Sequence, residues 1–420
     1  TAERAAGRRI AIMADLPGPK IRLGQLDPEP VQLHPGNPFT LTTANVVGDA
    51  TQASVTFDRL PQVVKPGCRL FLNDGLIELH VEKVSASEVL CRVVVGGELR
   101  SRKGLNLPGV DLGISAFTDR DRACLKFALE HGVDAVSQSF VGRAADLEAV
   151  RTATPAAGKP PFVIAKIERA GALEKLDEIL DAADGIMVAR GDLGVEVPIE
   201  EIALAQKRLI AQANLAGKPV ITATQMLESM VSNRLPTRAE ATDVANAVFD
   251  GTDALMLSAE SAMGQCPEDA VRMLARIAAV AENHRSPATL QALRDLYRRQ
   301  PSMPLADSIA MVVEHALETV ACAAVFVPTR TGTTARMISR FKPPAWIVAL
   351  SCDPVVCQSL HFSAGVVPVP LQNEPSDWCK FAHRWLDQHA LRGELAMLVT
   401  GPSPRHPEAN HRLEFLRLRA

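Results

Sequence analysis

The chain has 420 residues, of which 47% are hydrophobic and 22% charged, and its formal net charge is −3. This length suffices for two or three domains. The near-neutral charge argues against a nucleic-acid-binding protein, which would carry a clustered basic surface. Because no apolar run reaches the roughly 18 residues of a membrane span, we expect no membrane partner. Eight scattered cysteines without a CxxC pair indicate reduced thiols and a cytoplasmic location.

In chain order, the first predicted element is a short apolar strand at residues 10–14, which ends at Asp15. From 23 to 103, short alternating runs broken by Gly, Pro and Asn predict an antiparallel β domain. After residue 104, strand-like runs alternate with helical stretches, which predicts a parallel sheet. The strands of this sheet are expected at 135–140, 162–168, 185–190, 219–225 and 254–258.

A further α/β unit is predicted after a charged helical linker that begins near residue 285. Its strands are expected at 323–328, 346–351, 365–369 and 396–400. With the strand at 10–14, the central unit has six predicted strands. Six strands fit an open doubly wound sheet, whereas a (β/α)8 barrel needs eight, so these patterns leave both architectures open.

Polar side chains stand at the ends of two neighbouring predicted strands. Lys166 and Glu168 are two residues apart in one strand and therefore project from the same face. The next strand ends at Arg190-Gly191-Asp192, so Asp192 is expected at the same carboxyl-end rim. Two carboxylates suit Mg²⁺ or Mn²⁺ when substrate oxygens complete the coordination. A lysine beside them suits an oxygen that becomes negative during a reaction.

Two more features favour a ligand site at this rim. Gly191 lacks a Cβ, so its backbone can approach a ligand, and N–H groups at the start of a following helix suit a carboxylate or phosphate. Thr222 and Thr224 share one face of the next strand, so a hydroxyl can join the site or relay a proton. The alternatives are a plain ion pair between Lys166 and Glu168, and an adhesion loop for the Arg-Gly-Asp triplet, which its position at a strand end disfavours.

Longer motifs give the chain a family resemblance. The runs VIAKIE, MVARGDLGVEVP, GKPVITATQMLESM and PTRAEATDVANAVFDGTDALMLSAESA resemble pyruvate kinase, as do DLPGPKIRLG, FLNDGLIELHV, KGLNLPGVDL and GVDAVSQSFV. The resemblance extends from about residue 9 into the last domain, where it is weaker. It implies glycolytic phosphoryl transfer from phosphoenolpyruvate to ADP, which gives pyruvate and ATP through a metal-stabilised enolate.

The resemblance also implies the fold: an α/β (β/α)8 TIM barrel with an inserted β-barrel lid domain and a C-terminal regulatory-type α/β domain. The barrel would comprise residues 1–22 and 104–285, the lid 23–103, and the C-terminal domain 286–420. Family members begin two strands earlier, with a segment that supplies a phosphate-binding arginine and an Asn/Ser pair. The residues assigned to the barrel number about 200, against ~250 for a complete barrel. We therefore expect two further strands upstream of Thr1 or from another source, and without them an inactive, poorly folded protein.

For the reacting centre, the resemblance implies a role for each residue at the rim. Glu168 and Asp192 would hold the Mg²⁺ or Mn²⁺ ion. Lys166 would stabilise negative charge on the phosphoryl group and the enolate oxygen, and Thr224 would belong to the proton-delivery path. The backbone of Gly191 and Asp192 would bind the substrate carboxylate.

Further residues are implied for the nucleotide, the lid and the monovalent cation. Arg22, which would also take part in catalysis, and Lys103 would face the nucleotide and the phosphates. Asp74 would enter the site when the lid closes. Lys20 stands where potassium-dependent relatives commonly carry Glu, and Leu16 replaces the usual neighbour of Asp15. Because an ammonium group can stand where the cation would lie, we expect activity without K⁺.

The last domain carries a candidate effector loop, TRTGTT, which follows a predicted strand and can cradle a phosphate. It comprises Thr329, Arg330, Thr331, Gly332, Thr333 and Thr334. Relatives bind sugar-phosphate or nucleotide effectors there, and Arg405 and His406 of a later Pro-rich loop would join them. A purely structural loop is the alternative. The resemblance also implies a homotetramer, in which a helix at 233–249 meets a neighbouring subunit.

Two other functions remain open at this point. An inactive paralogue with a structural or regulatory role is disfavoured by five intact residues that a dead enzyme has no need to retain: Lys166, Glu168, Asp192, Thr224 and Lys103. Another metal–enolate barrel enzyme, such as an aldolase acting on pyruvate, is disfavoured by the inserted domain and Lys103, which favour a nucleotide.

Overall fold

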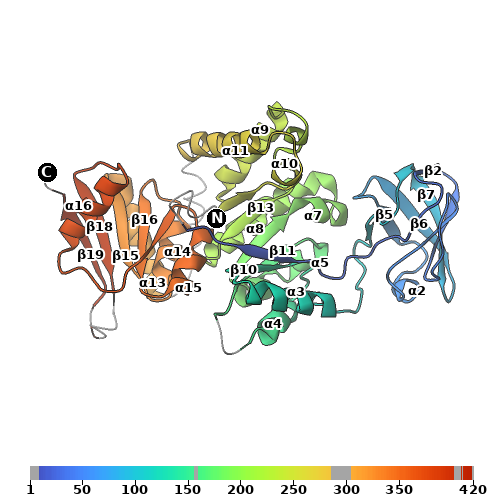
Figure 1. The fold of residues 1–420 in the computed structure, drawn as a ribbon, viewed down its shortest axis with the longest axis horizontal. Coiled ribbons are helices and arrows are strands. Elements are labelled where there is room, and N and C mark those ends of the chain that lie inside the picture. The colour runs from blue at the N-terminus through green and yellow to red at the C-terminus, as the bar shows by residue number, and fades with distance from the viewer. Residues whose placement is uncertain (1–8, 156–158, 285–303, 402–407, 409, 419–420) are drawn as a thin grey trace.

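The computed structural model describes residues 9–155, 159–284, 304–401, 408 and 410–418. Three units follow one another along the long axis of the molecule (Figure 1). A β unit, drawn in blue, lies at one end. A parallel sheet with its helices lies in the middle, and an α/β unit, drawn in orange and red, lies at the other end. The predicted linker near residue 290 falls outside the described residues, as do Arg405 and His406.

The central sheet has six parallel strands in the order β1-β10-β11-β12-β13-β14. Its strands are β1 (Met13–Leu16), β10 (Ala135–Gln138), β11 (Phe162–Ile167), β12 (Gly185–Ala189), β13 (Val220–Ala223) and β14 (Ala254–Met256). Each predicted strand is therefore confirmed in type, with ends that lie within three residues of those expected. Because all six strands run the same way, their carboxyl ends form one rim.

Helices connect these strands and cover the sheet. They are α3 (Asp119–Glu130), α4 (Ala144–Ala153), α5 (Ala170–Glu174), α6 (Leu176–Ala182), α7 (Arg190–Glu196), α8 (Ile202–Leu215), α9 (Arg238–Asp250), α10 (Ala259–Ala262) and α11 (Pro267–Glu282). The helix expected at 233–249 begins only at Arg238, because Thr237 caps its N-terminus in a capping box with Glu240. Gly251 ends this helix with a φ of 97°, a left-handed conformation that favours glycine.

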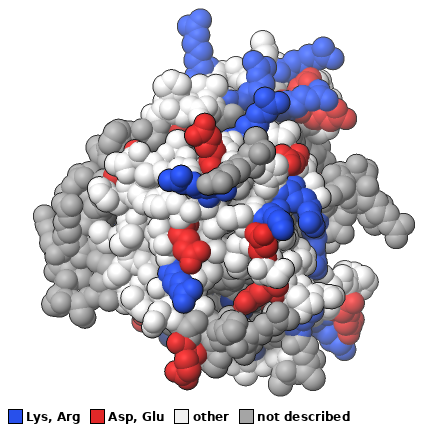
Figure 2. All heavy atoms as spheres, turned by 90° about the vertical axis from the view of Figure 1, so that its left-hand side faces the viewer, with Lys and Arg blue, Asp and Glu red and all other residues white. Residues whose placement is uncertain are grey.

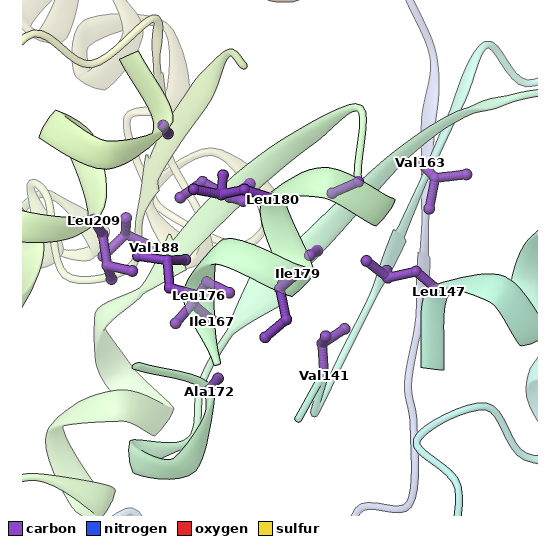
Figure 3. Close-up of a cluster of buried hydrophobic side chains, with 14 of the residues drawn as sticks. Val141, Leu147, Val163, Ile167, Ala172, Leu176, Ile179, Leu180, Val188 and Leu209 are labelled. Carbon is purple, nitrogen blue, oxygen red and sulfur yellow. The ribbon is translucent and has the colours of Figure 1, made fainter. Parts of the chain in front are cut away.

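The main hydrophobic core lies between the sheet and helices α4, α6 and α8. Figure 3 shows side chains of β11 and β12 directed toward those of the helices; they include Val163, Ile167, Val188, Leu147, Ile179 and Leu209. Each of these side chains is at most 1% exposed. Burial of one such side chain contributes about 1.5–3 kcal/mol, so this layer fixes the strands whose ends carry the polar rim.

The β unit follows β1 and is built from two sheets. The larger has the order β4-β3-β7-β6-β5-β9, and β2 pairs with β8 in the smaller. Their strands are β2 (Val31–Leu33), β3 (Pro38–Thr42), β4 (Gln52–Ser54), β5 (Arg69–Leu72), β6 (Ile77–Val84), β7 (Glu88–Val95), β8 (Gly97–Leu99) and β9 (Leu105–Asn106), with the short helix α2 (Leu60–Val63). The prediction of antiparallel strands holds except for β3 and β4, which pair in parallel. The core of this unit includes Ile21 and Leu112.

The C-terminal unit is a five-stranded sheet of order β17-β16-β15-β18-β19, with helices on both faces. Its elements are α13 (Leu305–Thr319), β15 (Ala324–Pro328), α14 (Thr333–Ser339), β16 (Trp346–Ser351), α15 (Pro354–Ser359), β17 (Val366–Pro370), α16 (Trp378–Gln388), β18 (Leu395–Thr400) and β19 (Arg412–Arg417). The four predicted strands are confirmed, and the antiparallel edge strand β19 was not predicted. Figure 2 shows acidic and basic side chains mixed on the outer end of the molecule, as on an ordinary protein surface.

Candidate active site

Lys166 lies at the centre of a polar cluster at the carboxyl-end rim of the central sheet. Its Nζ is 3.0 Å from Oε1 of Glu168 and 3.2 Å from Oδ2 of Asp15, and it donates a hydrogen bond of 2.8 Å to Oγ of Ser139. These partners come from the ends of β11, β1 and β10, so three neighbouring strands converge on one ammonium group. The predicted proximity of Lys166 and Glu168 is confirmed.

The electrostatics of this cluster follow from burial and from opposite charges. Glu168 is only 2% exposed, and its Oε2 accepts a hydrogen bond of 2.7 Å from the backbone N–H of Phe140. Burial raises the pKa of Glu168, Lys166 opposes that rise, and the charge of Asp192 adds to it. For Lys166, burial lowers the pKa, but Glu168 and Asp15 outweigh burial, so the net pKa is raised. The lysine is therefore a protonated cation at neutral pH.

Asp192 and Lys20 lie beside this cluster. Asp192 is in the first turn of α7, which begins directly where β12 ends, and its Oδ1 is 3.7 Å from Nζ of Lys20. Lys20 belongs to the segment that leads from β1 into the β unit. The cation of Lys20 is thus near one of the two carboxylates that were predicted to hold a metal.

The hydroxyl of Thr224 contacts the backbone of α7. Gly191 donates its N–H to Oγ1 of Thr224 across 2.7 Å, and the hydroxyl donates to the carbonyl of Ala223 across 2.6 Å. The substrate carboxylate is predicted to accept a hydrogen bond from the N–H of Gly191. To do so it would have to displace the hydroxyl of Thr224 from that N–H. Thr222 behaves differently from the expectation: it is fully buried and bonds to the hydroxyl of Thr252. Thr224 leaves the strand geometry with a φ of 68°, so strand alternation does not apply to the pair.

Arg190 holds the turn that contains Thr224. Its guanidinium donates to the carbonyls of Thr224 and Gln225 at 2.7 and 3.2 Å and forms an ion pair of 2.6 Å with Asp243 of α9. Thr224 and Gln225 both have a positive φ, at 68° and 53°, which is strained for residues with a side chain. Arg190 therefore stabilises an unfavourable backbone at the rim. The side chain of the arginine is only 10% exposed, so it does not form an adhesion motif.

The residues predicted for the nucleotide and the lid lie where the β unit joins the sheet. Arg22 forms a β-bridge with Gly104, and its side chain donates to the carbonyl of Arg102 at 3.0 Å. Lys103 is next to this bridge and is half-buried. Asp74 is exposed, and a Cβ on the adjacent Gly75 would lie 3.4 Å from Val195 of α7. Among the described residues, no hydrogen bond or ion pair joins Arg22, Lys103 or Asp74 to Lys166.

Comparison of the sequence with known protein families shows the family to which the chain belongs. Residues 1–271 match the family model for the pyruvate kinase barrel domain, and residues 307–407 match that for the pyruvate kinase alpha/beta domain. The chain belongs to the pyruvate kinase family. The predicted resemblance and the predicted α/β barrel fold are thereby confirmed, and the chain is a phosphotransferase of this family.

Individual pyruvate kinases are similar over most of the chain. It is 49% identical over 395 residues to the pyruvate kinase of Thermococcus litoralis, which covers 94% of this chain and 80% of that one. Identity is 43% over 401 residues to pyruvate kinase 2 of Synechocystis, covering 93% of this chain and 66% of that one. A crystal structure of a pyruvate kinase from Cryptosporidium parvum superposes with a TM-score of 0.90 at 33% identity and covers 100% of this chain and 86% of that one.

A divalent cation at this site would have few protein ligands. No group of three or more His, Cys, Asp or Glu side chains in the described residues is arranged to hold a metal. Glu168 and Asp192 nonetheless suit Mg²⁺ or Mn²⁺, since these ions bind through one or two carboxylates when substrate oxygens and water fill the remaining positions. The carboxylate pair therefore fits the ion, provided that a phosphorylated substrate binds with it.

Three residues of the site were not assigned a role from the sequence. Asp15 was noted only as the end of a strand, and Ser139 and Arg190 were read as parts of motifs. The position of Asp15 at a strand end, like that of Glu168, was the available signal. Ser139 also directly follows a strand, but it stood inside the strand expected at 135–140, and the chain turns at Phe140 with a φ of 59°.

In the predicted effector loop of the C-terminal unit, the threonine hydroxyls form hydrogen bonds within the loop. Thr329 accepts from the N–H of Gly332 at 2.9 Å, and the hydroxyls of Thr331 and Thr333 are 2.9 Å apart. Gly332 caps α14 with a φ of 80°. Arg330 is exposed and Thr334 is half-buried. The loop thus has the sequence of a phosphate cradle, and its use as one remains a prediction.

Proposed function

We propose that this chain transfers the phosphoryl group of phosphoenolpyruvate to ADP and forms pyruvate and ATP. The observation that carries the proposal is the Lys166 ammonium, held between Glu168, Asp15 and Ser139 at the rim where Asp192 and Thr224 also lie. The relatives named above are pyruvate kinases, which supports the same substrates for this chain.

Lys166 stabilises the charge that forms during the transfer. The bond between the enol oxygen and phosphorus breaks, and a terminal phosphate oxygen of ADP bonds to the phosphorus. The enol oxygen is then left with a negative charge. A buried ammonium close to that oxygen lowers the energy of this state, since electrostatic stabilisation is strong where water is excluded. A divalent cation, held by Glu168 and Asp192 when bound, supplies further positive charge beside the oxygens that become negative.

Thr224 belongs to the path that delivers a proton to the enolate carbon, which completes pyruvate. Its hydroxyl is held between Gly191 and Ala223, within a turn that Arg190 fixes. The backbone of Gly191 and Asp192 binds the carboxylate of the substrate. Arg22 and Lys103 face the nucleotide and the transferred phosphate, and closure of the β unit brings Asp74 over the site and excludes water.

Further parts of the proposal concern the ions, the effector and the assembly. Lys20 takes the place of K⁺ beside Asp192. The loop of Thr329, Arg330, Thr331, Gly332, Thr333 and Thr334 binds a sugar-phosphate or nucleotide effector. The protein is a cytoplasmic homotetramer with contacts that include α9. In the described residues, no helix combines the length and apolarity that crossing a bilayer requires.

The test is release of pyruvate from phosphoenolpyruvate by the purified protein, with and without ADP. We expect release that requires ADP and yields ATP in equal amount. If no pyruvate is released from phosphoenolpyruvate, with or without ADP, the protein would be an inactive paralogue. Cleavage of a longer 2-oxo acid to pyruvate without ADP would favour an aldolase. Lys166→Met serves as the matched control, since it removes the central cation while the fold is checked by circular dichroism.

A further inference from the structure

The segment by which the chain leaves the β unit is packed as a part of that unit. This return segment, residues 107–113, runs from β9 back to the central unit. Leu107 and Leu112 are 5% and 8% exposed and belong to the hydrophobic core of the β unit. Arg59, which directly precedes α2, donates to the carbonyl of Gly113 at 3.1 Å. Any movement of the β unit would therefore carry the return segment with it.

Two side chains of the central unit bind the middle of this return segment. Arg169 donates to the carbonyl of Val110 at 2.7 Å, a short bond that is typical of a charged donor. Glu196 accepts from the backbone N–H of Gly109, and it also accepts from the N–H of Ala170 at 3.5 Å. The two side chains thus bind an N–H and a carbonyl of adjacent residues, so both polar groups of this turn are paired across the two units.

The charges of these two side chains support each other. Burial raises the pKa of Glu196, and the charge of Arg169 is the largest influence that opposes this rise. Both residues are half-buried, so their attraction is screened less than that of two charges on the open surface. The guanidinium and the carboxylate therefore hold the turn as a pair, and removal of either one should weaken the hold of the other.

Both side chains come from elements that also carry a carboxylate of the candidate active site. Arg169 directly follows Glu168 at the end of β11 and precedes α5. Glu196 is the last residue of α7, and Asp192 lies in the first turn of the same helix. Each of the two carboxylates proposed for the metal is therefore joined, through one residue or one short helix, to a side chain that holds the β unit.

Helix α7 connects the polar rim with the β unit. It has seven residues and is therefore roughly 10 Å long. At its C-terminal end, a Cβ on Gly75 would lie 3.4 Å from Val195, so the turn that contains Asp74 approaches the helix closely. Figure 1 shows α5 and α7 on the side of the central unit that faces the β unit. The position of the β unit is thus set against this end of α7.

We propose that Arg169 and Glu196 are positioning residues that hold the return segment and thereby fix where the β unit stands relative to the rim. The inference rests on the proposed role of the β unit as a lid. With both contacts in place, Arg22 and Lys103 at the junction face the nucleotide at a fixed distance from Lys166. Without them, the β unit swings about its two connections, and the phosphates of the nucleotide are misplaced, which is costly for a transfer that depends on alignment.

Hydrogen exchange of the full chain, measured by mass spectrometry without substrates, tests the contact independently of turnover. In Arg169→Met and Glu196→Ala, peptides that cover residues 105–114 should exchange roughly tenfold faster or more, because the turn loses a charge-assisted bond. Peptides from β6 and β7 should exchange as in the wild type if the β unit stays folded. Arg208→Met is the matched control, since the exposed Arg208 donates to a carbonyl within the central unit, that of Leu173, at 3.1 Å.

Steady-state kinetics tests the consequence for the nucleotide. In both variants the KM for ADP should rise roughly three- to tenfold, whereas the KM for phosphoenolpyruvate should change less, because the β unit contributes Arg22 and Lys103 to the nucleotide. Arg169→Lys keeps the charge and one donor, so it should recover part of the affinity and part of the protection from exchange. A role in folding alone would not separate the two KM values in this way.

Three results would overturn the proposal. The first is exchange of residues 105–114 at the wild-type rate in both Arg169→Met and Glu196→Ala. The second is an equal increase of this exchange in Arg208→Met, which would mean general loosening of the central unit. The third is faster exchange with an unchanged KM for ADP, since the segment would then be held without positioning the β unit. A wild type that forms no ATP would contradict the proposed function alone, because the exchange measurement needs no turnover.

Discussion

Nζ of Lys20 lies 3.7 Å from Oδ1 of Asp192, so a cation fixed in the chain stands beside a carboxylate of the active site. Lys20 comes from the segment after β1, and Asp192 comes from α7, so the contact joins the entry to the β unit with the catalytic rim. The family resemblance implies Glu at the position of Lys20 in potassium-dependent relatives. We therefore propose that the ammonium group provides the charge that a monovalent ion would otherwise bring.

We predict that activity changes less than about twofold when K⁺ is replaced by Na⁺ or a bulky cation, since only the screening of charge differs. In Lys20→Glu, activity without K⁺ should fall and K⁺ should restore part of it. Steady-state rates in matched chloride salts give the answer. Lys83→Glu, an exposed lysine of β6, is the control for a change of net charge. Several-fold stimulation of the wild type by K⁺ would show that Lys20 does not replace the ion.

Lys166→Met should lower kcat by about 10²–10³, the usual effect of removing one group that stabilises developing charge. The KM for phosphoenolpyruvate should change less, because the charge on the enol oxygen arises only during the transfer. Removing the cation also leaves Glu168 buried without its ion pair. Lys166→Arg, which keeps the charge, separates the loss of charge from the loss of geometry. An equal kcat in the wild type and Lys166→Met would rule out the proposed role.

The sequence predicts the contact of Lys166 with Glu168 because strand alternation puts residues two apart on one face. It does not predict the contact of Lys166 with Ser139, which directly follows β10 and precedes a turn with positive φ at Phe140. The position of Thr222 is a second case in which strand alternation gives the wrong prediction. Alternation places it beside Thr224, but the chain leaves the strand at Ala223, and Thr222 becomes a buried partner of Thr252.

In the fold, too, some strands can be predicted from the sequence and others cannot. Apolar runs between helices identify all six central strands. The inner strands β10 to β13 are buried on both faces and therefore read as continuous hydrophobic stretches, whereas the outer strands β1 and β14 are only partly buried and are identified by their short apolar runs alone. The edge strand β19 (Arg412–Arg417) has only one buried residue, so its sequence, RLEFLR, gives no such run. Its pairing with β18 depends on contacts along the sheet edge, which local pattern does not encode. The boundaries proposed for the three domains remain predictions.

Arg190→Lys should lower activity roughly tenfold to a hundredfold, although Arg190 is a positioning residue whose contacts are with the turn at Thr224 and with Asp243. Lysine cannot reproduce the fork that binds Asp243 and the carbonyls of Thr224 and Gln225 together. The loss should fall mainly on kcat, because the proposed role of Thr224, delivery of a proton to the enolate, comes after phosphoryl transfer. Arg208→Lys, at an exposed arginine of α8, is the control. If Arg190→Lys has the kcat of the wild type, the turn at Thr224 and Gln225 does not need the arginine.

Lys342→Met should weaken the junction between the C-terminal unit and the central sheet. Lys342 and Asp253 are each 4% exposed at the side chain and pair at 2.5 Å, and Asp253 also accepts from the N–H groups of Val220 and Ala364. Loss of one partner from a buried pair typically costs about 3–5 kcal/mol. The midpoint of unfolding in urea should fall accordingly. The exposed pair of Arg272 and Glu268 is the comparison: Arg272→Met should cost no more than about 1 kcal/mol.

Glu240 should make the stability of α9 depend on pH. Burial raises the pKa of Glu240, but hydrogen bonds from Ser229 and Thr237 outweigh burial, and the net pKa lies below 4.5. A carboxyl group whose pKa is lower in the folded state stabilises it above the unfolded pKa. That stability is lost as the pH falls through the folded value. Glu240→Gln should therefore be less stable than the wild type by about 1 kcal/mol at pH 7.

The difference between wild type and Glu240→Gln should shrink as the pH falls below 4.5, because the wild-type carboxyl group becomes protonated and loses its advantage. Urea unfolding at several pH values between 7 and 3.5 measures this difference. Glu268→Gln, at an exposed glutamate of α11, controls for the general loss of one negative charge. If the difference in free energy of unfolding stays constant over this range, the protonated Glu240 caps α9 as well as the ionised form does. Its hydrogen bonds from Ser229 and Thr237 would then not depend on its charge.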